Sequence, residues 1–473
     1  MNSDLSSNLV PGKNNAPSEI KLRRVLKLHD LVIYGIILIQ PVAALPLFGH
    51  ANHISRGHAV TTILLAMVAM VCTAASYGRM ASRYPLAGSA YTYVGKALHP
   101  HLGFLAGWAM FLDYLLVPLI CAIYTSVATH HLFPAIPYTV WILFYAAGFT
   151  VLNLYGIKVT AGTNWVLLIV MSGVVFGFMA AAIHFVVTKG GAAGLLRLQP
   201  LYDPKTFSFD ALWAGTALAA LTYGGFDGLT TLSEEVENPR RNMLLAVVLT
   251  CLITGIWSGS QVYLAQLSWP EWQTFGKTGL GSSADMASLD TAILAVARRV
   301  GGAGLDAALA CILVLASVGS GITGQAGAAR LLYGMGRDGV LPRRFFGRLD
   351  RKHAEPVGNL LLIGALVLAG ALSLNYEETA RLINFGAFLA FMGVNLATLR
   401  EFFSLGEEKT LMRVATELIS PIIGFVICAL IWWALPLRTH LVGGVWLAAG
   451  IIYLAVRTKG FQQGAVKIDF SQV

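Results

Sequence analysis

The sequence predicts an all-α membrane protein whose chain crosses the bilayer twelve times. Hydrophobic residues make up 56% of the 473 residues and charged residues only 12%, which is far more apolar than a soluble domain of ordinary composition. The apolar residues gather into stretches of about 20, the length that crosses roughly 30 Å of hydrocarbon. Inside lipid each backbone N–H and C=O must be paired within its own segment, so we expect these stretches to be helices.

Twelve such stretches follow one another, separated by shorter polar segments. Their ends are uncertain by about 2–4 residues, because apolar periodicity defines the middle of a helix better than its boundaries. The stretches are 31–51, 60–77, 102–128, 138–155, 165–187, 211–232, 244–267, 307–332, 357–372, 380–399, 418–435 and 441–456.

Positive charge predicts the orientation of this map. If the N-terminal tail is cytoplasmic, 24 of the 33 Lys and Arg lie on the cytoplasmic side, which is where membrane proteins retain them. We therefore expect a multi-pass protein of the plasma membrane, the inner membrane in a bacterium, with cytoplasmic tails at 1–28 and 459–473. The same charges account for the net charge of +9, so no nucleic-acid partner is expected.

Two of the predicted helices are interrupted. Gln40 and Pro41 lie within the first, and proline removes a backbone donor from the helical ladder. Gly224 and Gly225 precede Asp227 in the sixth, where glycine permits unwound backbone. A packing kink is the plain alternative for each, but a matched pair of breaks would expose N–H and C=O groups to a solute near mid-membrane.

The two breaks also predict the organisation of the chain. Each break falls in the first helix of a half if 29–190 and 191–405 are inverted repeats of five helices. The segment 406–458 then supplies two peripheral helices at the C-terminal end of the chain.

Two carboxylates lie within the predicted spans. Asp227 sits beside the second break, and Asp113 lies about ten residues into the third helix, followed by Tyr114. A carboxylate at this depth is costly unless it is paired, protonated or hydrated, so both are candidates to bind an ammonium group, and Tyr114 could stack on the solute. The structural alternatives are that Asp113 accepts a hydrogen bond from a neighbouring helix and that Tyr114 packs as an ordinary buried ring.

Hydroxyl side chains form a stripe on the predicted eighth helix. Ser317, Ser320 and Thr323 recur at every third residue and so share one face. They could bind a coupling cation, or they could simply allow close helix packing. The histidines near the predicted outer loops form no closed ligand set, so solvated or interfacial side chains are favoured and neither a metal nor another cofactor is expected. These histidines are His50, His53, His58, His130 and His131.

The order and spacing of five motifs resemble the amino acid–polyamine–organocation superfamily and, within it, the bacterial putrescine importers. The resemblance extends over nearly the whole chain. The motifs are GSAYTYVGKALHPHLGFLAGW from Gly88, LDYLLVP around Asp113, GGFDGLTTLSEEVENPRRN from Gly224, ARLLYGMGRDGVLP from Ala329 and LINFGAFLAFMGVNL from Leu382.

This resemblance implies a leucine-transporter-like fold of two inverted five-helix repeats and two peripheral helices, with the solute held between the broken first and sixth helices. It implies that Glu234 and Glu235 form a gate at the cytoplasmic end of the sixth helix. The substrate-binding residues that it implies are Gln40, Pro41, Val42, Ala43, Ala44, Tyr114, Tyr223, Gly224, Gly225 and Asp227. Asp113 is added to this set because of its charge within the membrane.

The chain departs from the family pattern at two positions that bear on substrate and coupling. Pro46 stands where such putrescine importers have an acidic residue, and Met171 stands where many superfamily members have a lysine in place of a sodium ion. The second departure leaves the coupling ion open. A proton is favoured over sodium, with Asp227 as its carrier, because burial beside glycine-exposed backbone should disfavour the charged carboxylate, while Ser317 and Ser320 keep sodium open.

The function expected from these features is secondary active import of a small amine, either an amino acid or a polyamine such as putrescine, by alternating access. The alternatives are an amino acid or polyamine exchanger and a membrane solute sensor without transport. An enzyme is not expected, because the sequence has no metal-ligand cluster, nucleophile elbow or paired catalytic carboxylates in a known motif. The oligomeric state is not predicted.

Overall fold

A computed structural model describes residues 25–85, 89–155, 161–274, 289–337, 339, 341–350, 355–404 and 410–462, and in this part of the chain the secondary structure is helical except for one parallel bridge between Leu26 and Val236. Most of the expected tails 1–28 and 459–473 lies outside the described residues.

In the first half of the chain the helices coincide with the predicted apolar stretches, and a short extra helix covers the polar GSAYTYVGK segment. Pro100 occupies the first turn of α5, where its missing N–H costs no hydrogen bond. The helices are α1 Leu28–Ile39, α2 Phe48–Ile54, α3 Ala59–Arg83, α4 Ser89–Ala97, α5 Pro100–Leu132, α6 Tyr138–Leu154 and α7 Ala161–Gly190.

The second half begins with short 3-10 segments and continues with long helices. The Ser208 side chain caps α8, Pro239 begins α9, and α11 bends at Gly302, whose φ is 72°. The elements are η1 Ala192–Leu196, α8 Phe209–Ala219, η2 Ala220–Tyr223, η3 Phe226–Glu235, α9 Pro239–Ser268, η4 Trp272–Thr274, α11 Ala292–Arg337, α12 Arg343–Phe346, α13 Val357–Ser373, α14 Tyr376–Ser404, α15 Leu411–Val414, the π-helix η5 Ala415–Ile419, α16 Ser420–Trp433 and α17 Leu437–Arg457.

Among the described residues, eight helical segments are each long and apolar enough to cross a membrane. They are α3, α5, the Trp165–Gly190 part of α7, α9, α11, α14, the continuous segment from α15 to α16, and α17. The other four predicted spans correspond to α6 and α13, with 17 residues each, and to the two interrupted helices. The all-helical membrane architecture is confirmed, and the count of twelve spans stays a prediction.

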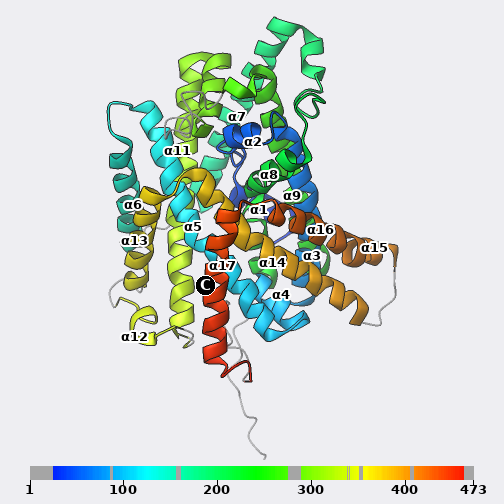
Figure 1. Cartoon of the computed structure of the whole chain (residues 1–473), viewed down its shortest axis with the longest axis vertical. Helices are drawn as coiled ribbons and strands as arrows, with labels where there is room; N and C mark the ends of the chain where they lie inside the picture. Colours follow the sequence, from blue (N-terminus) through cyan, green and yellow to red (C-terminus); the bar gives the residue numbers. More distant parts are fainter. Residues whose placement is uncertain are drawn as a thin grey trace, which may run out of the picture.

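Helices at corresponding places in the two predicted halves pack against each other. α3 packs against α9, α5 against α11 and α6 against α13. The interrupted helices follow the same rule, because α1 contacts η3 and α2 contacts α8. Figure 1 shows α6 and α13 together at one edge of the bundle.

Glycines allow the backbones of α3 and α9 to approach closely. A Cβ added to Gly78 would lie 2.5 Å from the Cα of Leu244, and one added to Gly255 would strike Met67. Small residues promote helix association in lipid, where van der Waals contact has to supply much of the attraction. This pair of helices is therefore held at a distance that larger side chains would not permit.

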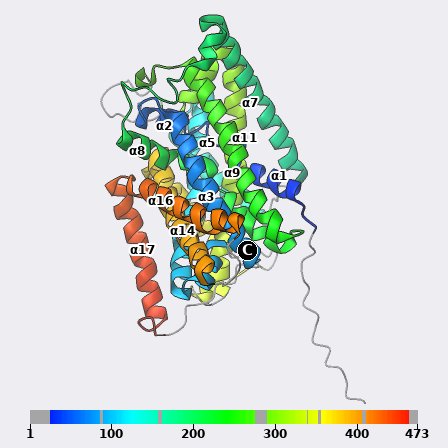
Figure 2. The same cartoon turned by 90° about the vertical axis from the view of Figure 1, so that its right-hand side faces the viewer.

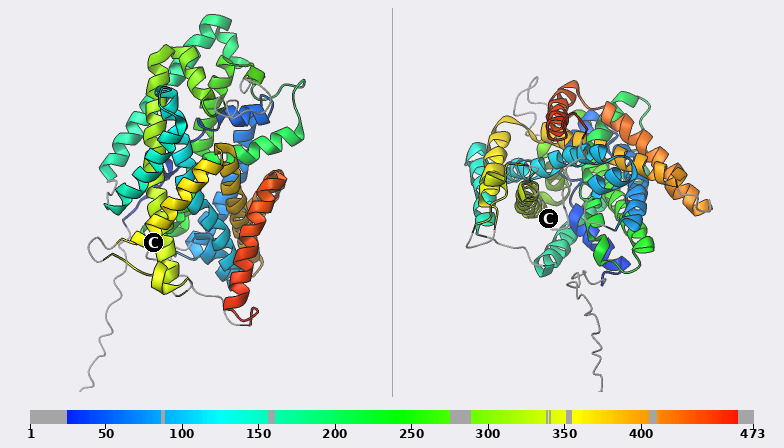
Figure 3. Two further views of the ribbon diagram at one scale, coloured as in Figure 1. Left: turned by 60° about the vertical axis from the view of Figure 1, so that its left-hand side comes forward. Right: turned by 90° about the horizontal axis from the view of Figure 1, so that it is seen from below.

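The last two long helices, α16 and α17, lie at the rim of the bundle (Figures 2 and 3). α17 is fastened to α5 by a reciprocal pair of indoles. Trp108 Nε1 donates to the carbonyl of Trp446 at 2.9 Å, and Trp446 Nε1 donates to the carbonyl of Trp108 at 3.0 Å. The two rings stack with their centroids 4.8 Å apart.

Loop contacts define two ends of the bundle. At the end that we call the terminal face, the Val25 N–H donates to the carbonyl of Glu235 at 2.9 Å, and Arg457 at the end of α17 donates to the carbonyl of Gly339. At the other end, the opposite face, the Asp203 N–H donates to His58 Nε2 at 3.0 Å. α3 begins at the opposite face, after His58, and ends at the terminal face.

Candidate functional site

The first interruption is present where the sequence predicts it. α1 ends at Ile39, Gln40 has a φ of 70°, and regular helix resumes only at Phe48. The carbonyl oxygen of Pro41 accepts hydrogen bonds from Trp257 Nε1 at 2.9 Å and Gln261 Nε2 at 3.0 Å. Side chains of α9 therefore satisfy part of the backbone that the break exposes.

The Gln40 side chain ties this break to α11. Its amide nitrogen donates to the carbonyl oxygen of Ala316 at 3.1 Å and to Ser320 Oγ at 2.8 Å. Ser320 was expected to bind a coupling cation and Gln40 a solute; here each already uses the other as its partner. Thr323, on the same stripe, has a different environment. It is exposed and donates to the carbonyl of Gly319, one turn back on the same helix.

The second interruption is also present. The helix changes from α8 to the 3-10 segment η2, breaks at Gly224 and Gly225, and continues as η3. Gly225 has a φ of 102°, a conformation that residues with a Cβ rarely adopt. Tyr223 directs its hydroxyl away from the break and donates to the carbonyl of Ile63 on α3 at 2.9 Å.

Asp113 and Asp227 line the same cavity. Gly224 and Gly225 contribute backbone to it, and Tyr223 forms part of its wall. The cavity measures only about 20 Å³, which suffices for one water molecule. In this structure the cavity is too small to hold an amine solute.

The other wall of this cavity comes from α14, which sequence reasoning missed as a site element. Asn384 is anchored by a 2.6 Å hydrogen bond from its amide to the carbonyl of Ala217, and Phe388 and Phe391 supply aromatic surface. Phe391 belongs to a cluster with Phe226, at 5.1 Å between ring centroids. The LINFGAFLAFMGVNL motif contained these residues, but its nearly uniform apolar character gave no sign of which face would meet Asp227.

The stretch Gln40–Ala44 does not line the two-carboxylate cavity. Val42 and Ala44 are buried and Ala43 half-buried, while Gln40 and Pro41 face a separate cavity of about 200 Å³. The structure thus divides the predicted binding residues between two places. The second cavity is lined by Ile36, Gln40, Pro41, Ser172, Phe176, Ile253, Thr254 and Trp257.

Tyr114 and Ser317 line neither of the two cavities. Tyr114 follows Asp113 on α5, is 37% exposed and lies within electrostatic range of Asp227. It is therefore near the carboxylates without being among the residues that line their cavity. Ser317 is half-buried on α11.

The predicted acidic gate lies at the terminal face. The carbonyl of Glu235 accepts from the N–H groups of Val25 and Leu26, at 2.9 and 3.0 Å, and the Glu237 N–H donates to the carbonyl of Leu26. The end of η3 is thereby joined to the start of α1 by backbone hydrogen bonds. The side chain of Glu234 lies outside the described part of the chain.

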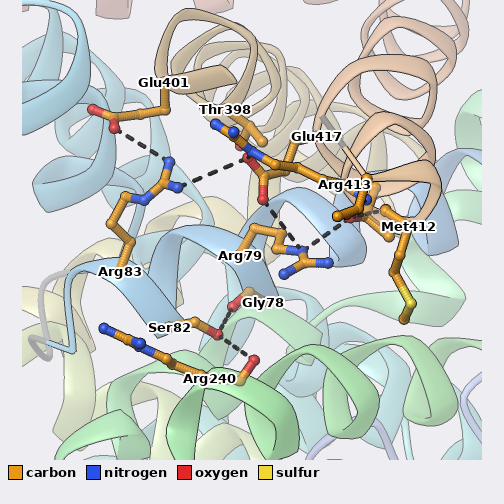
Figure 4. A network of polar contacts seen from close by, with 12 residues as sticks. Gly78, Arg79, Ser82, Arg83, Arg240, Thr398, Glu401, Met412, Arg413 and Glu417 are labelled. Carbon is orange, nitrogen blue, oxygen red and sulfur yellow. Dashed lines mark hydrogen bonds and ion pairs between the residues drawn. The ribbon is translucent and has the colours of Figure 1, made fainter. Parts of the chain in front are cut away.

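A charged network joins other elements at the terminal face (Figure 4). Arg83 pairs with Glu401 of α14 at 3.3 Å, and Arg79 lies 3.7 Å from Glu417 of η5. Arg413 donates to Glu417 at 3.0 Å, and both side chains are buried. Tyr84 donates to Glu401 at 2.9 Å, and burial together with this hydrogen bond raises the pKa of its phenol. The network fixes the end of α3 against α14 and η5.

Comparisons with known proteins show which family this chain resembles. A family model described as amino acid permease matches residues 46–450. The chain is 33% identical over 459 residues to the low-affinity putrescine importer PlaP of Escherichia coli K12, covering 97% of this chain and 98% of that protein. It is 25% identical to the branched-chain amino acid permease BcaP of Lactococcus lactis, over 91% and 94% of the two chains, and 24% identical to the methylthioribose transporter of Bacillus subtilis, over 91% and 92%.

Proposed function

This chain belongs to the amino acid permease family of the amino acid–polyamine–organocation superfamily, and from that premise we propose that it imports a small cationic amine of the putrescine type by proton-coupled alternating access. As a member of this family it is a multi-pass membrane transporter of amine solutes and not an enzyme.

The observation that carries the choice of solute is the pair of carboxylates, Asp113 and Asp227, in one cavity. Lys and Arg are missing from the residues that line this cavity in the described structure, so its fixed charge favours cations. Phe388 and Phe391 add aromatic faces, which also attract an ammonium group. An unpaired carboxylate inside a membrane protein is costly, and a bound ammonium would offset that cost.

Alternating access is supported by the packing of the two halves. The pairing of α3 with α9, α5 with α11 and α6 with α13 is what inverted repeats spanning 29–190 and 191–405 would produce. The terminal face is assigned to the cytoplasm because the predicted cytoplasmic arginines Arg79, Arg83, Arg400 and Arg413 gather there.

Coupling to protons is supported by the engagement of Ser320 in the hydroxyl stripe. A sodium ion would need several free oxygen ligands, and Gln40 already donates to the Ala316 carbonyl and to Ser320. Asp227 is 5% exposed and lies at the break, where it can meet both the solute and a proton.

Ligand-induced thermal stabilisation of the purified protein tests the solute class. A ligand that binds only the folded state raises its stability by RT ln(1 + [L]/Kd), about 2.7 kcal/mol at 100 times Kd. Putrescine and related diamines should raise the melting temperature in a saturable manner, while isosteric diols should not. Stabilisation by neutral amino acids alone would contradict a cationic solute.

An amino acid is the second candidate, because the exposed backbone of Gly224 reaches the cavity and could receive a carboxylate. The same panel separates the two solutes. Uptake into vesicles with and without internal amine then separates import from exchange, since an exchanger requires solute on both sides. Binding without any flux would instead favour a solute sensor.

A further inference from the structure

A buried histidine joins three separate elements at the opposite face. His50 Nε2 lies 2.6 Å from Asp290 Oδ1, and His50 Nδ1 lies 3.0 Å from Glu377 Oε2. Their side chains are 1%, 8% and 14% exposed, respectively. The sequence favoured a solvated or interfacial histidine here, and the solvated alternative is wrong for His50, because carboxylates distant in sequence enclose the ring.

The geometry fixes the number of protons in this cluster. A neutral imidazole carries one N–H, so it can donate to only one of two carboxylates. The second ring nitrogen would then present its lone pair to an ionised carboxylate oxygen about 3 Å away, which is repulsive. Both short contacts are satisfied when the cluster holds one further proton, as the imidazolium or as a protonated carboxyl beside the neutral ring.

The charge around the cluster agrees with this proton count. Arg381 pairs with Glu377 one turn away on α14. His50 as a cation and Arg381 together balance Asp290 and Glu377, whereas loss of the proton would leave a net negative charge in a buried place. Uncompensated buried charge is strongly destabilising, so loss of the proton opposes this arrangement of the three elements.

The cluster lies where several elements meet at the opposite face. His50 is on α2, Asp290 precedes α11 and Glu377 begins α14. The His50 ring stacks on Tyr376, at 6.1 Å between centroids, and Tyr376 in turn packs on Tyr124 of α5 at 5.4 Å. These contacts bring four elements together at one point.

Other titratable or charged groups surround the cluster, and most have partners of their own. His53 on α2 is exposed and its ring meets Trp272. On α11, Arg298 lies 4.0 Å from Asp306, which also bonds His131. On α11, Arg299 pairs with Glu271. The remaining groups on the adjacent elements include Tyr376, Glu378 and Arg381 on α14, Arg438 on α17, Tyr124 on α5, Tyr138 on α6, Asp210 on α8 and His58 before α3.

We propose that His50, Asp290 and Glu377 form a proton-binding latch that holds the opposite face shut, so that closing this face takes up one proton. When the face opens, water reaches the imidazole, and its pKa is then the ordinary one of a hydrated histidine, about 6.5. The closed face keeps the proton at higher pH. Lowering the pH therefore favours closure until the open-state imidazole is itself protonated, and below that point pH has no further effect.

Cys121 provides the readout, because it lies one turn from Tyr124 on α5, close to Tyr376, and is buried. The protein is placed in lipid nanodiscs without solute, with its other four cysteines replaced by alanine. A bulky thiol reagent then reports how often the opposite face opens. Each modification rate is divided by that of His50→Gln at the same pH. This relative rate cancels the pH dependence that comes from ionisation of the thiol itself.

The relative rate should fall several-fold, up to tenfold, for each unit that the pH is lowered from 9 toward 7. His53→Gln, on the same short helix, should keep this dependence. Asp290→Asn should abolish it while the face still closes, because a neutral imidazole can donate to Glu377 and accept from the new amide. If His50→Gln does not fold, Asp290→Asn replaces it as the reference, and the rate of the otherwise unchanged protein divided by that of Asp290→Asn should show the same fall.

A flat relative rate in the otherwise unchanged protein would overturn the proposal. So would a dependence that survives in Asp290→Asn. The measurement uses no amine, so a wrong solute class or a wrong coupling ion would leave its outcome unaffected.

Discussion

Asp113 and Asp227 face the same small cavity from different helices, so their contributions to binding can be measured separately. A hydrogen bond to a charged group is worth about 1.5–3 kcal/mol, and about 1.4 kcal/mol corresponds to a factor of ten in Kd. We expect Asp227→Asn to weaken putrescine binding roughly 10- to 100-fold, and Asp113→Asn to act in the same direction, by isothermal titration or stabilisation.

Asp210→Asn is the matched control, since this aspartate is exposed at the start of α8. It should leave the Kd unchanged. Unaltered affinity in both cavity variants would show that aromatic or backbone groups recognise the amine, and the carboxylate model would then be wrong.

At the scale of the element, the break in the sixth helix depends on the backbone of Gly225. Its φ of 102° costs a residue with a Cβ about 1–2 kcal/mol, and the space around it is adequate, because an added Cβ would lie 3.5 Å from the nearest atom. Gly225→Ala should therefore lower the melting temperature and slow transport through conformation alone. Gly444→Ala on α17, where an added Cβ meets nothing within 4 Å, should lower neither, because alanine is the better helix former. A neutral result for Gly225→Ala would mean that the break tolerates ordinary backbone.

The terminal-face network makes a second prediction at this scale. Glu417 is 5% exposed and faces Arg413, Arg79 and Arg83. Removal of one partner from a buried pair costs about 3–5 kcal/mol, so Glu417→Ala should lower the thermal stability markedly. Glu271→Ala removes an exposed partner of Arg299, for which less than about 1 kcal/mol is expected. Equal effects of the two substitutions would mean that the network does not stabilise the terminal face.

At the scale of the whole molecule, the coupling ion is decided by accumulation in proteoliposomes. An inward proton gradient without sodium should drive uptake of the amine, since Gln40 occupies oxygens that sodium would need. Asp227→Asn should abolish accumulation and spare exchange measured at saturating amine, because exchange requires no net movement of protons. Accumulation that depends on sodium and ignores pH would return attention to Ser317 and Ser320.

The sequence by itself determined the features that depend on local chemistry. A run of apolar residues long enough to cross lipid has to be helical, and the helices were predicted to within a few residues at most ends. Pro41 and Gly225 predict breaks in their helices because each alters its own backbone. Proline lacks the N–H donor, and glycine lacks a Cβ. The order and spacing of five sequence motifs also indicated the family.

Only the tertiary structure decided which polar groups meet. His50 and Glu377 are 327 positions apart, and Gln40 and Ser320 are 280 apart. A polar side chain in a membrane helix has to find a partner, but the sequence does not say which one, since every candidate helix is apolar on most of its surface. Phe388 and Asn384 became part of the cavity because α14 turns that face toward Asp227, and helix rotation follows from the packing of all the neighbouring helices together.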